Sequence, residues 1–241
     1  TYTDVTDYYT SIGSGAHFVE YAEGIYVGYR YYETAAVEAA AGNYPGFDYD
    51  AAVTFPFGFG LSYTSFKREL LDVRREDGDV VASVRVSNEG QVAGRDVAQL
   101  YSTPPTSLSV EKSAVSLVAF SKTDELAPSA SQTVEVKVSL ADLKSYDARG
   151  RGSYVLEAGD YYLAIGADAH DALNNVLAAK GVSGTDAAGD AAKAAKLALA
   201  GSDAYETSPY PGVPVTNQFE DADVRSYDPS FVYLTRSDWA G

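Results

Sequence analysis

The chain has 241 residues and a net charge of −16, from 34 acidic and 18 basic side chains. Such an acidic surface repels phosphate groups, which argues against nucleic acid and an anionic membrane as partners. The sequence has no cysteine and two histidines far apart, which excludes disulfides, a thiolate nucleophile and a histidine metal site at helical spacing. We therefore expect no metal and no cofactor.

The start of the sequence indicates a piece of a longer protein. It begins at Thr1 and contains no methionine, whereas a natural start codon would leave one. No run approaches the ~20 apolar residues of a membrane span, and no signal-peptide pattern is present. The compartment stays open, with the cytoplasm slightly favoured.

The first segment, residues 1–65, holds 11 of the 20 tyrosines and 5 of the 9 phenylalanines. Its β-branched and aromatic residues predict extended strand over 17–34, and its prolines and glycines predict a loop over 43–60. So many rings would leave a large apolar patch in water unless they pack on something. They pack either on the next segment or on a domain outside this chain.

The second segment, residues 66–170, reads as an all-β, antiparallel sandwich of the immunoglobulin-like or fibronectin type III-like kind. Apolar residues alternate with polar ones over 79–88, 133–140 and 159–167, which is typical of strands with one buried face. The predicted inward positions are Val80, Ala82, Val84, Val86, Val134, Val136, Val138, Leu140, Tyr161, Leu163 and Ile165.

Turn and capping signals separate these strands. Asp77-Gly78 is one of several turn pairs between short apolar runs, a spacing that favours a sandwich. Ser139 and Asp142 have the spacing that caps a single helical turn after the strand at 133–140.

The third segment, residues 171–241, reads as an arm. Its alanine-rich stretch predicts one helix over about 187–200, ended by Gly201. An extended, proline-rich run follows, and residues 230–239 have the pattern of a last short strand.

Five residues of the aromatic segment form a candidate interdomain or sugar-contact surface: Tyr26, Tyr29, Arg30, Tyr31 and Tyr32. Tyrosine rings can stack on sugar rings as a platform. The same rings also suit packing in a core or between domains, and the sequence leaves both readings open.

The acidic residues give no convincing catalytic or metal site. Glu20, Glu23 and Glu33 could supply the carboxylate pair of glycosidic acid–base chemistry, but alternating strand positions favour a solvated edge. Asp48 and Asp50 offer too few oxygens to enclose a calcium ion. We assign no catalytic residue.

Several sequence blocks, in order, resemble the C-terminal region of glycoside hydrolase family 3, the β-glucosidase-like family. They read YAEGIYVGYRYYE, FPFGFGLSYTSF, VSNEGQVAGRDVAQLYSTPP and LEAGDYYLAIGADAHD. The resemblance covers residues 18–171. It implies a fibronectin type III-like domain that follows an α/β sandwich domain, in a parent that hydrolyses O-glycosyl bonds of β-linked glucosides by a retaining mechanism with two carboxylates.

The last residues contain a Ser-Asp-Trp triplet like the one that carries the nucleophile of this family, which makes Asp238 a candidate. That aspartate belongs on a strand of a TIM-type barrel, which takes about 250 residues, more than the whole chain. The acid/base glutamate of the family belongs to the α/β sandwich domain. We therefore interpret Asp238 as a connector residue and expect Trp239 to be partly exposed or held by local contacts.

The tail resembles the connector of a subgroup with inverted domain order, in which the barrel follows the fibronectin-like domain. The resemblance implies a non-catalytic structural domain whose partners are the catalytic domains of the same polypeptide. Two alternatives stay open: a carbohydrate-binding module that contacts oligosaccharide through tyrosine platforms, and a self-contained hydrolase that uses Asp238 and a glutamate.

Overall fold

In the computed structural model, the described residues are 9–12, 16–19, 21–106, 110–148, 150–186, 188–208, 212–217, 223–237 and 239. None of the helices among them is long and apolar enough to cross a membrane.

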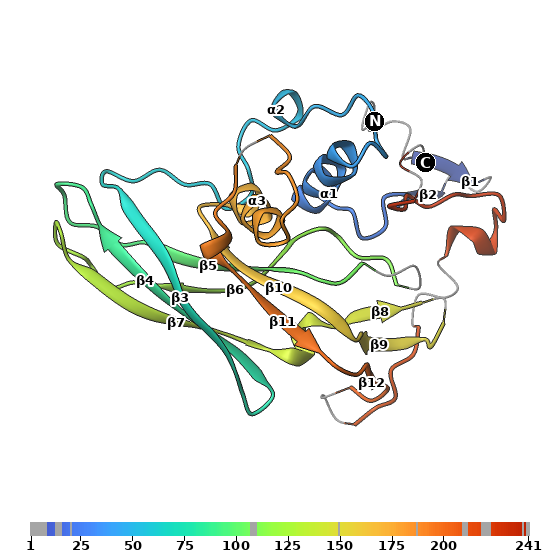
Figure 1. Cartoon of the computed structure of the whole chain (residues 1–241). Helices are drawn as coiled ribbons and strands as arrows, with labels where there is room; N and C mark the ends of the chain where they lie inside the picture. Colours follow the sequence, from blue (N-terminus) through green and yellow to red (C-terminus); the bar gives the residue numbers. More distant parts are fainter. Residues whose placement is uncertain are drawn as a thin grey trace.

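Two antiparallel sheets pack face to face and form the predicted sandwich (Figure 1). One sheet has the order β3-β4-β7 and the other the order β11-β10-β5-β6. The strands of the first sheet are β3 (Phe66–Glu76), β4 (Asp79–Asn88) and β7 (Ser131–Ser139). Those of the second are β5 (Val97–Thr103), β6 (Ser116–Lys122), β10 (Gly159–Gly166) and β11 (Ala194–Leu199).

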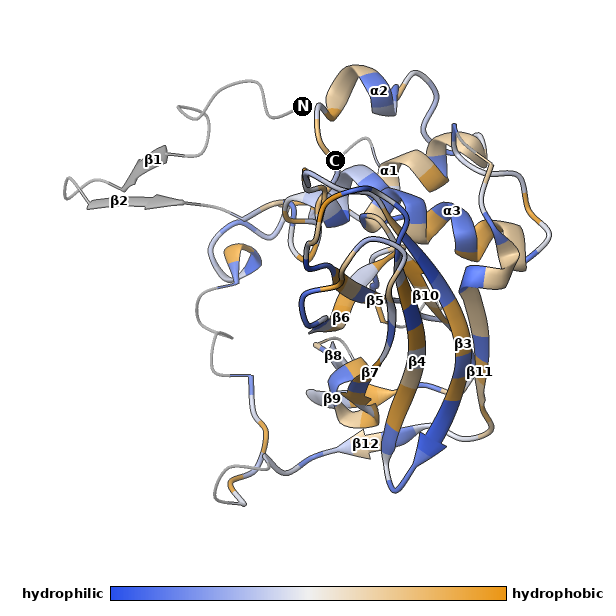
Figure 2. Cartoon of the chain, turned by 90° about the vertical axis from the view of Figure 1, so that its left-hand side faces the viewer, coloured by the Kyte–Doolittle hydropathy of each residue, from blue (hydrophilic) through white to orange (hydrophobic). Residues whose placement is uncertain are grey.

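The main core lies between these sheets, as the alternation of apolar residues predicts. Val84 on β4 and Leu163 on β10 are both fully buried in it. Figure 2 shows the alternation of apolar and polar residues along β4. Every predicted inward position belongs to this one cluster, so the strand-facing prediction is confirmed.

The predicted turn is confirmed, and so is the part of the predicted cap that Ser139 supplies. Asp77 and Gly78 both have positive φ, 45° and 91°, the conformation that a two-residue hairpin turn requires. After β7 the chain makes one 3-10 turn, Leu140–Leu143. Ser139 caps its N-terminus, because its side chain accepts a hydrogen bond from the backbone N–H of Ala141.

The chain has further short strands outside the two main sheets. A third sheet has the order β12-β9-β8, and β1 pairs with β2 as a separate hairpin. Their bounds are β1 (Tyr9–Ile12), β2 (Ala16–Val19), β8 (Ser145–Asp147), β9 (Ser153–Leu156) and β12 (Asp203–Tyr205).

The helix predicted over 187–200 is wrong. That stretch forms a short 3-10 turn, Ala191–Lys193, and then β11, which pairs antiparallel with β10. The strand supplies the backbone hydrogen bonds that the edge of β10 needs, and this need outweighs the helix propensity of alanine. The sheet therefore continues past residue 170, into the segment that reads as an arm.

A helix in the third segment lies earlier, at α3 (Ala169–Ala179). The Asp168 side chain caps it by accepting from the N–H of Asp171. Ala172, Leu173 and Val176 pack it on the outer face of β10.

The extended strand predicted over 17–34 is present only at its start, in β2, and is wrong beyond it: residues 22–25 form a turn and α1 (Tyr29–Ala40) follows. Thr34 explains part of the difference. Its hydroxyl donates to the carbonyl of Arg30 and accepts from the N–H of Ala114, so a contact outside the helix fixes the helical backbone. A four-residue helix, α2 (Tyr49–Ala52), interrupts the loop predicted over 43–60. Both α1 and α3 lie at one end of the sandwich (Figure 1).

The end of the chain contains a 3-10 turn, Val224–Ser226. The short strand predicted over 230–239 is not among the named strands of the described residues.

Candidate functional site

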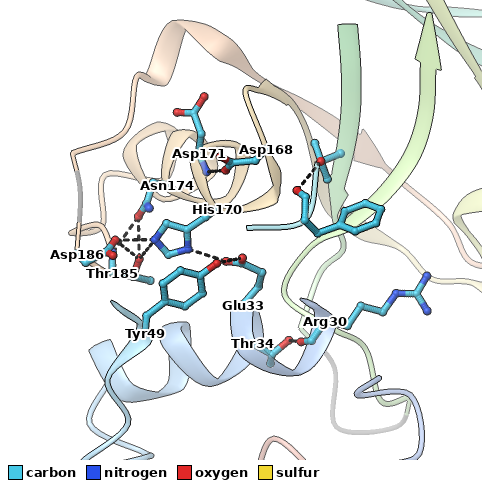
Figure 3. Close-up of polar contacts among 12 residues, drawn as sticks. Arg30, Glu33, Thr34, Tyr49, Asp168, His170, Asp171, Asn174, Thr185 and Asp186 are labelled. Carbon is cyan, nitrogen blue, oxygen red and sulfur yellow. Dashed lines mark hydrogen bonds and ion pairs between the residues drawn. The ribbon is translucent and has the colours of Figure 1, made fainter. Parts of the chain in front are cut away.

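The aromatic segment is fastened to the sandwich by a buried polar network around His170, drawn in Figure 3. The Nδ1 atom of His170 lies 2.7 Å from Oε2 of Glu33 on α1, and its Nε2 atom lies 2.6 Å from Oδ1 of Asp186. The Tyr49 hydroxyl donates to Oε1 of Glu33 at 2.5 Å, and its ring stacks on the imidazole with 3.8 Å between ring centres. The network thus joins α1, α2 and α3.

The charges of this network favour a protonated His170. Burial alone would lower the pKa of His170, but the hydrogen bonds and negative charges of Glu33 and Asp186 raise it to about 9. Burial and the hydrogen bond to Glu33 raise the pKa of Tyr49 well above its ordinary value. For Asp186, burial alone would raise the pKa, yet the bond to His170 lowers it.

This arrangement fastens helices and is poorly suited to acid–base catalysis. Both ring nitrogens of His170 are bonded to carboxylates, and the residue is buried. A general base needs a free nitrogen within hydrogen-bond reach of its substrate. The loop that carries Asp186 is held in turn, because the N–H of Thr185 donates to Oδ1 of Asn174.

The five residues of the predicted surface do not share one face of the molecule. Tyr26 is fully buried and donates to Oε1 of Glu111. Tyr31 packs its ring edge-to-face against Trp239.

Tyr29 contacts other residues: its ring stacks on Phe57 with 4.2 Å between ring centres, and its hydroxyl accepts from the N–H of Leu117. Tyr32 is half-buried and Arg30 is exposed. The tyrosines therefore surround α1 and contact different neighbours.

Five exposed apolar side chains follow one another along the loop that leads from α2 to β3. We call the following residues the aromatic face: Phe55, Phe57, Phe59, Leu61 and Tyr63. Leu61 is 92% exposed and Tyr63 is 99% exposed. The sequence predicts a loop over 43–60 and no site there. Its apolar residues alternate with glycine and proline, and that pattern was the available signal.

The sandwich holds the backbone of this loop at several points. The carbonyl of Phe57 accepts from the N–H of Ala169 at the start of α3, and the carbonyl of Gly58 accepts from Nε2 of Gln99. Gly58 has φ of 93°, and a Cβ there would lie 2.3 Å from Oε1 of Gln99. Only glycine fits such a position. The backbone of the face is therefore fixed at Phe57 and Gly58.

A hollow of about 430 Å³ adjoins the aromatic face. Tyr29 and Tyr32 of α1 line one side, and Phe55 and Phe57 of the loop line another. The hollow has mainly apolar walls and suits an apolar or aromatic group of a partner.

The acidic candidates are dispersed. Glu33 is hydrogen-bonded to His170 and Tyr49. Asp48 caps α2 by accepting from the N–H of Ala51. Glu20 and Asp238 lie outside the described residues. Within the described ranges, no three His, Asp or Glu residues gather as a metal site would require.

Trp239 differs from the expectation of partial exposure or local contacts. It is buried, and its ring packs against Tyr26, Tyr31 and Tyr44, which lie about two hundred residues earlier in the chain. The end of the chain is therefore attached to the aromatic segment.

Comparisons with known proteins agree with this architecture. The model of the Fibronectin type III-like domain matches residues 96–169. A β-glucosidase of Ruminococcus albus is 37% identical over 174 residues, which cover 70% of this chain and 17% of that protein. β-Glucosidase A of Butyrivibrio fibrisolvens is 36% identical over 172 residues, or 64% of this chain and 19% of that protein.

Solved structures give the same result. A β-glucosidase of Kluyveromyces marxianus superposes with a TM-score of 0.59 at 28% identity, over 78% of this chain and 19% of that one. One from Paenibacillus barengoltzii has a TM-score of 0.57 at 30% identity, over 77% and 18%. The chain spans about a fifth of the length of these relatives. Residues 96–169 carry the fibronectin type III-like domain, and the chain is similar to the matching region of β-glucosidases of glycoside hydrolase family 3.

Proposed function

We propose that the chain is a non-catalytic domain that braces the catalytic domains of a longer enzyme, one that hydrolyses β-linked glucosides. The observation that carries the proposal is the aromatic face. Leu61 and Tyr63 are almost fully exposed on the same loop as three other exposed rings, and so many apolar side chains in water favour an interaction site.

The rigidity of the face supports docking to a fixed partner. Its backbone is bonded to β5 and α3 through Gln99 and Ala169, so little conformational entropy is lost when a partner covers it. A paired catalytic carboxylate site tolerates only about 0.5 Å of misplacement. A fixed bracing surface meets that demand.

The partner we propose is a catalytic domain of the same polypeptide. The chain covers only 17% of the Ruminococcus albus β-glucosidase and 19% of the Butyrivibrio fibrisolvens enzyme, so most of a comparable protein lies outside it. Phe57 of the face stacks on Tyr29, the first residue of α1 in the aromatic segment. A domain that comes before this segment is therefore the nearest candidate, and the tail resemblance favours a barrel that follows.

The surroundings of the tyrosines favour docking over sugar binding. A sugar platform needs an open ring face. Tyr26 is fully buried, and the ring of Tyr29 is stacked on Phe57. Oligosaccharide contact thus remains the alternative, through the aromatic face instead of the predicted tyrosines.

A first test measures catalysis and sugar binding by the isolated chain. We expect no hydrolysis of aryl β-glucosides above a matched blank and no saturable binding of cellobiose. Turnover that disappears in Asp238→Asn would show that the chain is an enzyme. Saturable cellobiose binding that disappears in Tyr63→Ser would favour the carbohydrate-binding alternative.

A second test examines the docking face inside a complete enzyme. The chain replaces its matching region in the Ruminococcus albus β-glucosidase, and Leu61→Asp with Tyr63→Asp is introduced. We expect the double variant to lower kcat/KM at least tenfold, because charge in an apolar interface is costly. The matched control is Val92→Asp, at a half-exposed valine outside the face. Equal activity of double variant and control would contradict docking here.

A further inference from the structure

A separate apolar cluster joins the two ends of the chain. It contains Tyr26, Ala35 and Trp239, all buried, with Tyr31 and Tyr44 packed against them. Trp239 stacks on Tyr44 at 5.7 Å between ring centres and an interplanar angle of 11°. Trp239 thus fills a cage built by α1 and the residues on either side of that helix.

Polar contacts fix the same segment at defined positions. The N–H of Leu234 donates to the carbonyl of Ala22 at 2.9 Å. The N–H of Arg236 donates to Oε1 of Glu111 at 2.6 Å, the atom that also accepts from the Tyr26 hydroxyl. These backbone contacts set which residue of the segment faces which residue of the cage.

A nearly buried ion pair completes the attachment. The guanidinium of Arg236 lies 2.6 Å from Oε1 of Glu38, and their side chains are 19% and 8% exposed. The other oxygen of Glu38 accepts from Nδ2 of Asn43. Because an unpaired buried carboxylate is costly, the cage selects a cation at position 236 and an aromatic ring at position 239.

We propose that Leu234, Arg236 and Trp239 form a clasp, which binds the cage of Tyr26, Glu38, Tyr44 and Glu111. The clasp holds the polypeptide that leaves the domain beside the polypeptide that enters it. Figure 1 shows the C-terminal segment, in red, next to α1 and the blue segment that leads into it. Domains attached at the two ends are then held side by side.

Through α1, the clasp is also connected to the His170 network and to the hollow beside the aromatic face. Tyr31, Ala35 and Glu38 of α1 contact the clasp, while Glu33 faces His170. Tyr29 of the same helix lines the hollow beside the aromatic face. None of the clasp residues belongs to the aromatic face, so this inference can fail or succeed independently of the bracing role.

The sole tryptophan of the chain gives a direct readout, since all tryptophan fluorescence comes from Trp239. In the full chain we expect a blue-shifted emission and weak quenching by acrylamide. Glu38→Arg and Arg236→Glu should each shift the emission to the red and raise quenching. The swapped pair, with both substitutions, should restore the native values.

Two controls separate the clasp from the sandwich. Glu69→Arg reverses a half-exposed acid on β3 that pairs with Lys67 and should leave the emission unchanged. Far-UV circular dichroism should match wild type in each variant, because the sandwich itself is unchanged. If Glu38→Arg fails to fold, Tyr44→Ala and Arg236→Gln take its place, because both remove clasp contacts without adding a buried charge of the wrong sign.

A distance measurement tests the juxtaposition of the ends. The chain has no cysteine, so Ile25→Cys and Ser237→Cys provide the only sites for spin labels. We expect one short distance in wild type and a longer, broad distribution with Arg236→Glu. Native fluorescence typical of a solvent-exposed tryptophan, or an unchanged distance in Arg236→Glu, would overturn the clasp.

Discussion

Two apolar clusters of this chain are held together in different ways. The core between the sheets is built mainly from aliphatic side chains on paired strands, such as Val84 and Leu163. The cluster at the end of the chain has few members, and aromatic rings and the Arg236–Glu38 pair dominate it. Burial stabilises the first at any pH, whereas the attachment of the aromatic segment depends on charges. The sandwich is therefore the scaffold, and the helical end is a piece fastened to it.

The largest expected effect of a single change lies in the sandwich core. Leu163→Ala should lower the free energy of unfolding by about 2–5 kcal/mol, because it leaves a cavity at a fully buried site. Urea denaturation measures it. The control, Val92→Ala at a half-exposed position, should change stability by less than about 0.5 kcal/mol. An equal loss in both variants would mean that the core is assigned wrongly.

The second effect is a dependence on pH at the fastened end. The folded-state pKa of His170 is raised from 6.5 to about 9, so its contribution is complete below pH 6.5 and is lost as the pH rises through 9. The total is on the order of 3 kcal/mol. Urea denaturation between pH 6 and 9.5 should show this decline. A chain that is equally stable at both limits would contradict the protonated histidine.

A smaller effect comes from removing one carboxylate of that network. Glu33→Gln should lower the free energy of unfolding by roughly 1.5–3 kcal/mol, because Tyr49 and His170 lose a charged acceptor. It should also flatten the alkaline decline, which a purely steric effect would not do. The matched control is Glu23→Gln, a glutamate on the same segment outside the network. Retention of the full pH dependence in Glu33→Gln would separate the decline from His170.

The smallest expected change in stability lies on the aromatic face. Leu61→Ser and Tyr63→Ser remove exposed side chains and should change the free energy of unfolding by less than about 0.5 kcal/mol. Solubility of the isolated chain should nevertheless rise, because the exposed apolar patch shrinks. Solubility and unfolding are measured on the same samples. A large loss of stability would mean that these side chains belong to the fold.

The sandwich could be read from the sequence because its strands carry their own signal. Alternation along β4 and β10 gives the buried face without knowledge of the partner strands. The helix α1 carried no such signal. Its tyrosines favour strand, and contacts of Thr34 and Glu33 with residues far along the chain decide the conformation. β11 is the converse case, in which an alanine-rich stretch becomes a strand because an edge of the sheet needs a partner.

The candidate site was only partly predictable for the same reason. The tyrosines around α1 were identified as contact residues, but their neighbours depend on how the helix is turned. His170 gave no sign of its role, since its partner Glu33 lies 137 residues away. The exposure of Leu61 and Tyr63 is a property of the folded surface. Asp238 lies outside the described residues, so its interpretation as a connector residue stays a prediction.

The attachment of Trp239 to the aromatic segment sets when this cluster can pack during synthesis. Glu38 and Arg236 are separated by 198 residues, which a ribosome adds in about 10–40 s at 5–20 residues per second. During that interval the residues of the cage, Tyr26 and Tyr44 among them, have been synthesised, but Trp239, which fills the cage, has not. The emerging chain thus exposes aromatic rings for seconds, a period in which chaperones can bind them. The packing around Tyr26 and Tyr44 is therefore complete only after Trp239 has been made.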